Sequence, residues 1–242
     1  MTELGIDDAG RVRRIHIRRP ERLNSLGTAH LDALTDAITV REAEIDVLVL
    51  TGEGRAFCSG ADLSASVDAG TVAAAARVTT AIAQARQPVI AAVNGPAAGV
   101  GASIALACDL VVAVRSAYFL LPFLPLGLVP DGGGTHSVLA AGRARATRLA
   151  LGGERLPAET AEAWGLVSDV VDDDGLEARV AAYTARIVAS PEAAAETKRL
   201  LRAADNPQLA AALEREQEVQ ARLLDSATFF AARDAFLARA RS

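Results

Sequence analysis

The sequence predicts an α/β protein with a mostly parallel sheet, followed by a helical C-terminal region. Short apolar segments bounded by turn residues alternate with helical patterns over roughly the first half of the chain, an order that favours parallel strands joined by right-handed crossovers. From Asp131 onward one helical pattern follows another. The 242 residues, 51% of them hydrophobic, can bury a large core.

The first half of the chain holds most of the expected strands. Apolar and polar residues alternate over Val12–Ile17, which predicts a strand. A helix is predicted from Thr28, as its N-cap, to about Glu44. Further elements are expected as a helix over residues 71–87 and strands over residues 46–50, 89–93, 110–114 and 118–121.

The second half is predicted to be mainly helical, with one short strand over residues 167–171. Helices are expected over residues 132–142, 143–153, 156–165, 174–189, 191–205, 207–226 and 227–242. The last of these has an apolar stripe made of Phe229, Phe230, Ala232, Phe236 and Leu237. Such a stripe is typical of a core helix, and equally of a helix that packs on another subunit.

Glycine-rich turns follow two of the expected buried strands. Residues 51–60 read TGEGRAFCSG, and residues 94–101 read NGPAAGVG before a helix that begins near Gly99. A glycine turn at a helix start leaves unpaired backbone N–H groups at the positive end of the helix dipole. We therefore expect a site for an anion, or for an oxygen that becomes negatively charged.

Two other interpretations of the second turn stay open. Gly95, Gly99 and Gly101 have a GxxxGxG spacing, which would fit a nicotinamide-dependent reductase. Against it, the strand after the helix ends in Arg115, where an acidic residue would be expected to bind a ribose. Alternatively, the glycines only let a helix pack closely on the sheet, which is compatible with ligand binding.

Composition excludes several classes of protein. A net charge of −5 and a pI near 5.3 argue against nucleic-acid binding. No apolar run approaches the roughly 20 residues of a membrane span, and the N-terminus has no signal segment, so a cytoplasmic protein is expected. Cys58 and Cys108 lie in apolar segments, which predicts reduced core thiols and no metal site.

The segments FCSGADL at residues 57–63 and VNGPAAGVG at residues 93–101 together resemble the crotonase superfamily, the enoyl-CoA hydratase/isomerase family. RPERLNSL and PDGGGTHSVL extend the resemblance, which covers nearly the whole chain. It implies a crotonase-like spiral of ββα units over residues 1–190 and a helical trimerisation region over residues 191–242. It also implies a homotrimer or dimer of trimers, with acyl-CoA thioesters as substrates and coenzyme A as part of the substrate rather than a bound cofactor.

The resemblance also implies where the thioester binds. Its carbonyl oxygen would lie between the backbone N–H groups of Ser59 and Val100, which stabilise an enolate oxygen and make the α-proton acidic. Coenzyme A would lie near Arg22, Leu23, Ala61, Asp62 and Leu63. Lys198 would be a further phosphate contact.

The two glutamates of the family's hydratases are replaced by Ser103 and Phe123, which we expect to line the acyl pocket. Hydration needs one group to deprotonate water and one to deliver a proton, so we expect double-bond isomerisation instead. The alternatives are a non-catalytic acyl-CoA-binding protein, thioester hydrolysis, or residual hydration with water ordered by Ser103.

Asp131, in the segment PDGGG, is the one acid left at a motif position. In the family's isomerases a carboxylate here moves a proton along the acyl chain, and one base is enough for that reaction. Two roles are therefore open for Asp131, namely catalysis and a helix N-cap. An apolar pocket would raise its pKa. His136 is expected to be structural.

Overall fold

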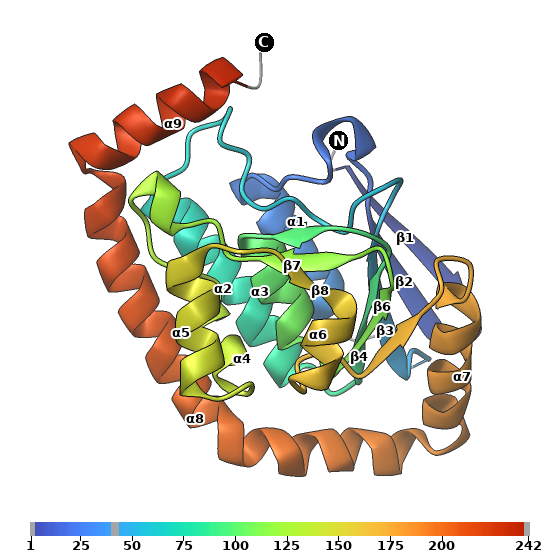
Figure 1. Cartoon of the computed structure of the whole chain (residues 1–242). Coiled ribbons are helices and arrows are strands. Elements are labelled where there is room, and N and C mark those ends of the chain that lie inside the picture. The colour runs from blue at the N-terminus through green and yellow to red at the C-terminus, as the bar shows by residue number, and fades with distance from the viewer. Residues whose placement is uncertain (1–2, 40–43, 240–242) are drawn as a thin grey trace.

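The centre of the molecule is a six-stranded sheet (Figure 1), in a computed structural model that describes residues 3–39 and 44–239. Its strands, in spatial order, are β1 (Leu4–Ala9), β2 (Val12–Ile17), β3 (Val47–Gly52), β4 (Val89–Val93), β6 (Leu110–Val114) and β9 (Asp169–Val171). β1 and β2 are antiparallel, and all later neighbours are parallel. The predicted α/β class and parallel pairing are therefore confirmed. β1 was missed because most of its residues are exposed and two adjacent ones, Asp7 and Asp8, are charged.

Helices cover both faces of this sheet. Figure 1 shows α7 (Leu176–Ala189) on one side and α1 (Thr28–Thr39), α2 (Ala69–Gln84) and α3 (Val100–Ala107) on the other. Every residue of β3 and β4 is buried as a result. Strands covered on both faces are expected to be continuously apolar, which explains why these two segments were recognisable.

A small second sheet lies beside the glycine turn. It is made of β5 (Ala97–Ala98), β7 (Tyr118–Leu120) and β8 (Leu156–Pro157), in that order. β5 and β8 were not predicted, because strands of two residues have no detectable periodicity. β5 also forms a bridge from Ala97 to Cys58, and this bridge joins the two glycine-rich turns.

The starts of two helices differ from the prediction. Thr28 is the first residue of α1 rather than its cap, and its hydroxyl lies 2.8 Å from that of Thr71. α2 begins at Ala69 because Asp68 and Thr71 form a reciprocal capping box. The first helix was predicted to end at about Glu44. The structure describes α1 as far as Thr39, and residues 40–43 are outside the described residues.

The rest of the chain is mainly helical, as predicted. It contains η1 (Pro20–Arg22), η2 (Leu124–Leu126), α4 (Gly134–Leu139), α5 (Arg143–Gly152), α6 (Ala158–Ala163), α8 (Pro191–Leu224) and α9 (Ala227–Arg239). The prediction of two helices over residues 191–226 is wrong, because α8 is continuous and has Pro207 inside it. Proline lacks an N–H and its ring presses on the preceding turn, and α8 changes direction sharply along its length (Figure 1).

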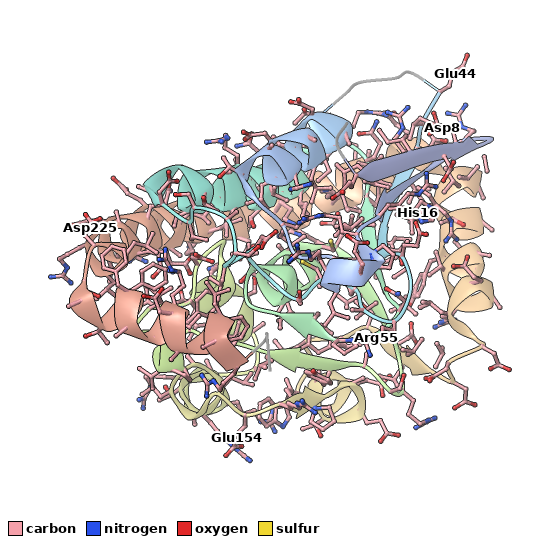
Figure 2. All side chains as sticks on the ribbon, turned by 90° about the horizontal axis from the view of Figure 1, so that it is seen from above. Asp8, His16, Glu44, Arg55, Glu154 and Asp225 are labelled. Carbon is pink, nitrogen blue, oxygen red and sulfur yellow. The ribbon has the colours of Figure 1, made fainter. Side chains whose placement is uncertain are left out.

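The second leg of α8 packs on the body of the same chain. Leu209 and Leu213 form a buried cluster with Ala76 and Ala83 of α2. α8 then ends at Asp225, its C-cap, labelled in Figure 2, and α9 follows. A separate region over residues 191–242 and its trimeric assembly stay predictions.

The apolar stripe predicted on the last helix is only partly buried. Phe229 is 1% exposed and packs near Gly127, whereas Phe230 and Phe236 are each 45% exposed. The core role of Phe229 is confirmed.

Candidate active site

The second glycine turn exposes a backbone N–H at the start of α3. Gly99 is the N-cap, with φ 54°, and its own N–H donates to the Leu120 carbonyl oxygen over 2.9 Å. Val100 is the first helical residue, and within the described part of the chain its N–H has no acceptor. The prediction that Val100 presents a free donor is consistent with this geometry.

The first glycine turn lies directly against the second. A Cβ atom on Gly60 would lie 3.0 Å from the Ala98 carbonyl oxygen and 3.5 Å from the Gly99 Cα. Gly60 also has φ 105°, a conformation that side chains rarely adopt. Glycine is therefore required here for the two turns to approach.

The prediction that Ser59 supplies the second donor is wrong in this conformation. The Ser59 N–H donates to the Leu23 carbonyl oxygen over 3.0 Å. Leu26 and Ala61 form a parallel β-bridge. The Leu26 N–H donates to the Gly60 carbonyl oxygen, and the Leu26 carbonyl oxygen accepts from the Asp62 N–H. Since successive amides in an extended segment point to opposite sides, the Ala61 N–H points away from Leu26. Ala61 is then the free donor on this turn, because its N–H meets no acceptor among the described residues.

The residues predicted to bind coenzyme A lie around this turn. Leu23 has φ 50°, and its carbonyl holds Ser59, while Arg22 is exposed beside it. Asp62 lies 3.2 Å from Arg19 and accepts hydrogen bonds from Ser64. Burial alone would raise the pKa of Asp62, but the bonds from Ser64 and Arg19 lower it overall.

Asn24 fixes this loop and was missed by the sequence analysis. It is fully buried, with φ 59°, and its Oδ1 accepts from the Arg19 N–H over 2.9 Å. Its Nδ2 donates to the carbonyls of Glu53 and Ala56. Asparagine adopts a left-handed backbone more readily than most residues, and its short side chain can form hydrogen bonds with nearby main-chain groups. The asparagine in the segment LNS, residues 23–25, was therefore the signal that the sequence offered.

Asp131 is a buried carboxyl group with one oxygen unpaired. It is 8% exposed, and its Oδ2 accepts from Nε2 of Gln220 over 3.1 Å. Oδ1 has no hydrogen-bond partner in residues 3–39 and 44–239. Burial raises the pKa of Asp131 to about 7; the bond from Gln220 works against this, and the charge of Glu216 adds to it. The N-cap of α4 is Gly133, so Asp131 is not the side-chain cap.

Close packing places Asp131 beside the Val100 turn. The Ser103 hydroxyl donates to the Asp131 carbonyl oxygen over 2.7 Å. A Cβ atom on Gly132 would lie 3.2 Å from the Val100 side chain, and one on Gly134 only 2.7 Å from the Ser103 oxygen. A side chain at position 134 would therefore collide with Ser103. Ser103 uses its hydroxyl proton to hold this segment, which leaves little basis for water ordering.

Phe123 borders the same turn. It is 7% exposed, and its ring lies 3.9 Å from where a Cβ atom of Gly99 would be. Position 123, where a hydratase glutamate is expected, therefore carries an apolar ring next to the Val100 donor. Asp131 is therefore the predicted catalytic acid that remains beside the Val100 donor.

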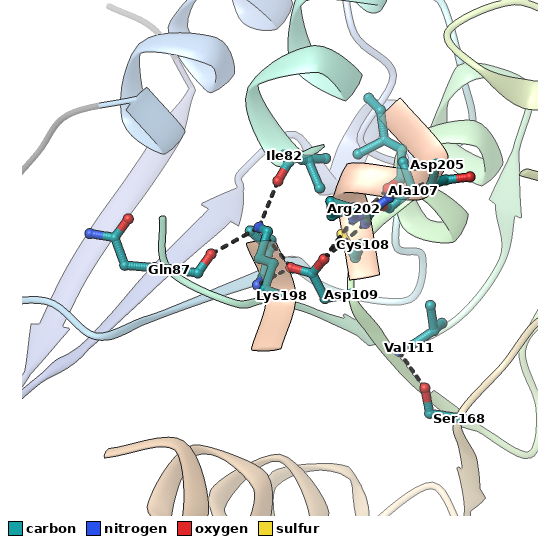
Figure 3. A network of polar contacts seen from close by, with 12 residues as sticks. Ile82, Gln87, Ala107, Cys108, Asp109, Val111, Ser168, Lys198, Arg202 and Asp205 are labelled. Carbon is teal, nitrogen blue, oxygen red and sulfur yellow. Dashed lines mark hydrogen bonds and ion pairs between the residues drawn. The ribbon is translucent and has the colours of Figure 1, made fainter. Parts of the chain in front are cut away.

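Two residues that were weighed for the site lie elsewhere. The His136 Nε2 lies 2.8 Å from Asp205 Oδ1, which supports the structural role expected for it. The prediction that Lys198 contacts phosphate is wrong. Its Nζ is buried and bonded to the carbonyls of Ile82 and Gln87 and to Asp109 (Figure 3).

Two grooves elsewhere on the molecule are separate from these turns. One, of about 650 Å³, lies between α1, α2 and α8, and another, of about 680 Å³, lies beside Lys198 and Arg202. Neither is lined by Asp131 or Val100. Lys198 and Arg202, two of the cations that line the second groove, already pair with Asp109.

Both cysteines are buried free thiols, as predicted. Burial raises the pKa of Cys58 and of Cys108 to about 12. In the described ranges, no helix is long and apolar enough to cross a membrane.

Comparison with known proteins gives consistent results. The enoyl-CoA hydratase/isomerase family matches residues 7–241. A protein of Rhodobacter capsulatus named probable enoyl-CoA hydratase is 40% identical over 231 residues, 92% of this chain and 90% of that one. The 1,2-epoxyphenylacetyl-CoA isomerase of Escherichia coli is 44% identical over 66% of each chain. The crystal structure of an enoyl-CoA hydratase from Mycobacterium avium subsp. paratuberculosis has 41% identity and a TM-score of 0.92, covering 98% of this chain and 96% of that one.

Proposed function

Because the chain belongs to the enoyl-CoA hydratase/isomerase family, we propose that it moves a carbon–carbon double bond along the acyl chain of a coenzyme A thioester. One observation carries this proposal. Asp131, a buried acid whose pKa is raised to about 7 by burial, lies in a segment packed against the Val100 turn, whereas Ser103 and Phe123 occupy the positions of the hydratase glutamates.

In this mechanism the thioester oxygen accepts hydrogen bonds from the N–H groups of Ala61 and Val100. The Asp131 carboxylate removes a proton from the α-carbon of a 3-enoyl thioester, and the electrons move into the carbonyl to give a dienolate. The protonated Asp131 then returns the same proton to the γ-carbon, and the carbonyl reforms. One acid is sufficient, because no atom is gained or lost.

The environment of Asp131 suits this exchange. A carboxyl group of ordinary pKa would give up its proton to water at neutral pH and return it poorly to carbon. Burial raises the pKa of Asp131 to about 7, and proton transfer is most efficient when the pKa of the group lies near the working pH. Each oxyanion donor is typically worth roughly 2.7–4 kcal/mol.

Coenzyme A would enter as part of the substrate. We assign it to the surface formed by Arg22, Leu23, Ala61, Asp62 and Leu63, where Arg22 is exposed. Asp62 is already paired with Arg19, so its negative charge is offset before a phosphate approaches.

Hydration is the second candidate, and it is favoured by the names of several relatives, including the Rhodobacter protein and a 2,3-dehydroadipyl-CoA hydratase of Escherichia coli that is 36% identical over 90% of this chain. The lack of titratable side chains at positions 103 and 123 disfavours it here.

Product analysis distinguishes these reactions. The protein is incubated with 3-enoyl-CoA and 2-enoyl-CoA thioesters of several chain lengths, and the products are separated and their masses measured by mass spectrometry. We expect conversion of the 3-enoyl to the 2-enoyl thioester without a change in mass. A product heavier by one water molecule would replace the proposal by hydration. Tight binding without any product would indicate a non-catalytic acyl-CoA-binding protein.

A further inference from the structure

After Pro207, helix α8 carries two polar side chains on its buried face. Glu216 is 5% exposed and Gln220 is 1% exposed, and they lie four residues apart on the stripe that also contains Leu209, Leu213 and Leu224. Burying a polar or charged side chain is costly unless it finds hydrogen-bond partners. Their partners therefore show what this face of α8 does.

Gln220 forms hydrogen bonds with Val129 and with Asp131, in the segment that precedes α4. Its Oε1 accepts from the Val129 N–H over 3.0 Å, and its Nε2 donates to Asp131 Oδ2 over 3.1 Å. The amide thus ties the orientation of the carboxyl group to the backbone two residues earlier. Oδ1, which has no partner in the described chain, is left for proton transfer.

Glu216 holds the backbone on the other side of Asp131. Oε2 accepts from the Gly133 N–H over 2.7 Å, and Oε1 accepts from the N–H and the hydroxyl of Thr135. The N-cap of α4, Gly133, has no side chain of its own to bond these groups. Glu216 therefore places a carboxylate at the start of α4, close to Asp131.

We propose that Gln220 and Glu216 are positioning residues for Asp131, Gln220 by orienting its carboxyl group and Glu216 by fixing its backbone and placing a negative charge beside it. This inference rests on the proposed function, in which Asp131 is the base. It assigns part of the acid/base apparatus to a helix about 90 residues further along the chain, on the evidence of contacts 83 and 89 residues apart.

The two residues act on Asp131 in opposite directions. The negative charge of Glu216 raises the pKa of Asp131, whereas the hydrogen bond from Gln220 lowers it. Burial raises the pKa of Glu216 itself, although the bonds from Thr135 and Gly133 work against this. From the other elements packed here, the facing groups are the uncharged hydroxyls of Thr79 and Ser103 and, next to Glu216, His136 with its partner Asp205.

A purely structural role is the competing explanation. Glu216 would then only cap α4, and Gln220 would only fill the interface. Replacing either would lower stability and the amount of folded protein, but the pH at which the remaining folded enzyme becomes active would stay the same. The pH dependence of turnover thus separates the two explanations.

The test uses Glu216→Gln and Gln220→Met, which keep the approximate size of each side chain. The ionised form of Asp131 is the base, so kcat/KM rises with pH through its pKa. We expect Glu216→Gln to move the midpoint of this rise to lower pH and Gln220→Met to move it to higher pH, each by about one pH unit. The matched controls are Glu218→Gln, at an exposed position of the same helix, and Gln217→Met, at a half-buried position whose amide donates to the Leu213 carbonyl oxygen. Neither control should move the midpoint.

A second measurement does not depend on turnover. The carboxyl carbon of Asp131 is followed by ¹³C NMR during a pH titration of the full chain and identified by its absence in Asp131→Asn. Opposite shifts in the two variants would support the inference even if no isomerase activity were found, in which case only the proposed function would fail. Midpoints that stay unchanged, or that move in the same direction, would overturn it. If Gln220→Met does not fold, Gln220→Glu should raise the midpoint further.

Discussion

Asp131→Asn is expected to lower isomerase turnover by about 10²–10⁴-fold, the range typical of a general acid–base residue. Asparagine has the shape of aspartate but does not accept a proton from carbon at neutral pH. The fold should be retained, because the oxygen of the new asparagine can still accept a hydrogen bond from Nε2 of Gln220 and a costly buried charge is removed. Turnover is measured at saturating 3-enoyl-CoA, and acyl-CoA binding by calorimetry.

Asp174→Asn is the control for this substitution, because Asp174 is exposed and far along the chain from both turns. The Asp174→Asn variant should have the same turnover of 3-enoyl-CoA as the unmodified protein. If Asp131→Asn also retained full turnover, Asp131 would have no part in the mechanism. A loss of binding together with turnover would indicate a damaged site instead of a missing base.

Val100→Pro is expected to lower kcat by about 10²–10³-fold, the effect of removing one oxyanion donor. Proline is accommodated at the first position of a helix, where the N–H has no intrahelical partner. Val100 occupies this position in α3, so the substitution removes the proposed donor with little change to the helix. KM should change much less than kcat, because the donor acts mainly on the enolate oxygen.

Val100→Ala is the matched control, since it shortens the side chain but keeps the N–H. We expect it to retain most of the turnover, with a small loss from the contact between Val100 and Gly132. Equal losses in Val100→Pro and Val100→Ala would attribute the effect to side-chain packing. The amide would then have no special role in the reaction.

Much of the fold could be predicted because its central strands are buried on both faces. β3 and β4 are continuous apolar segments, and the family and the crotonase-like fold class inferred from the glycine motifs are confirmed. β5 could not be found, because it has two residues and depends on pairing with β7. Pro207 was wrongly predicted to begin a new helix, because α8 runs through it and packs on α2 just beyond it.

The site was predicted less completely, for a physical reason. The segment FCSGADL pairs with the chain around Leu23 and Leu26, and this pairing determines which backbone N–H stays free. The Ser59 N–H bonds Leu23 and the Asp62 N–H bonds Leu26. The residues next to each donor in the sequence do not predict which carbonyl oxygen accepts from it. The role of Lys198 was predicted wrongly, because the sequence around this lysine does not indicate that its side chain is buried and paired with Asp109.

Glu216 and Gln220 did leave a signal in the sequence. Both lie at helical spacing from Leu209, Leu213 and Leu224, where an apolar residue would be expected. A polar residue on an apolar stripe indicates a buried partner elsewhere, although the sequence does not identify it as the loop of Asp131.

A crystal structure with a bound acyl-CoA that has no movable double bond tests the central claim most directly. We predict that the thioester oxygen lies about 2.7–3.2 Å from the backbone nitrogens of both Ala61 and Val100, with Asp131 Oδ1 facing the α- and γ-carbons. A thioester oxygen bound away from these two amides, or an acyl chain that Asp131 does not face, would contradict it.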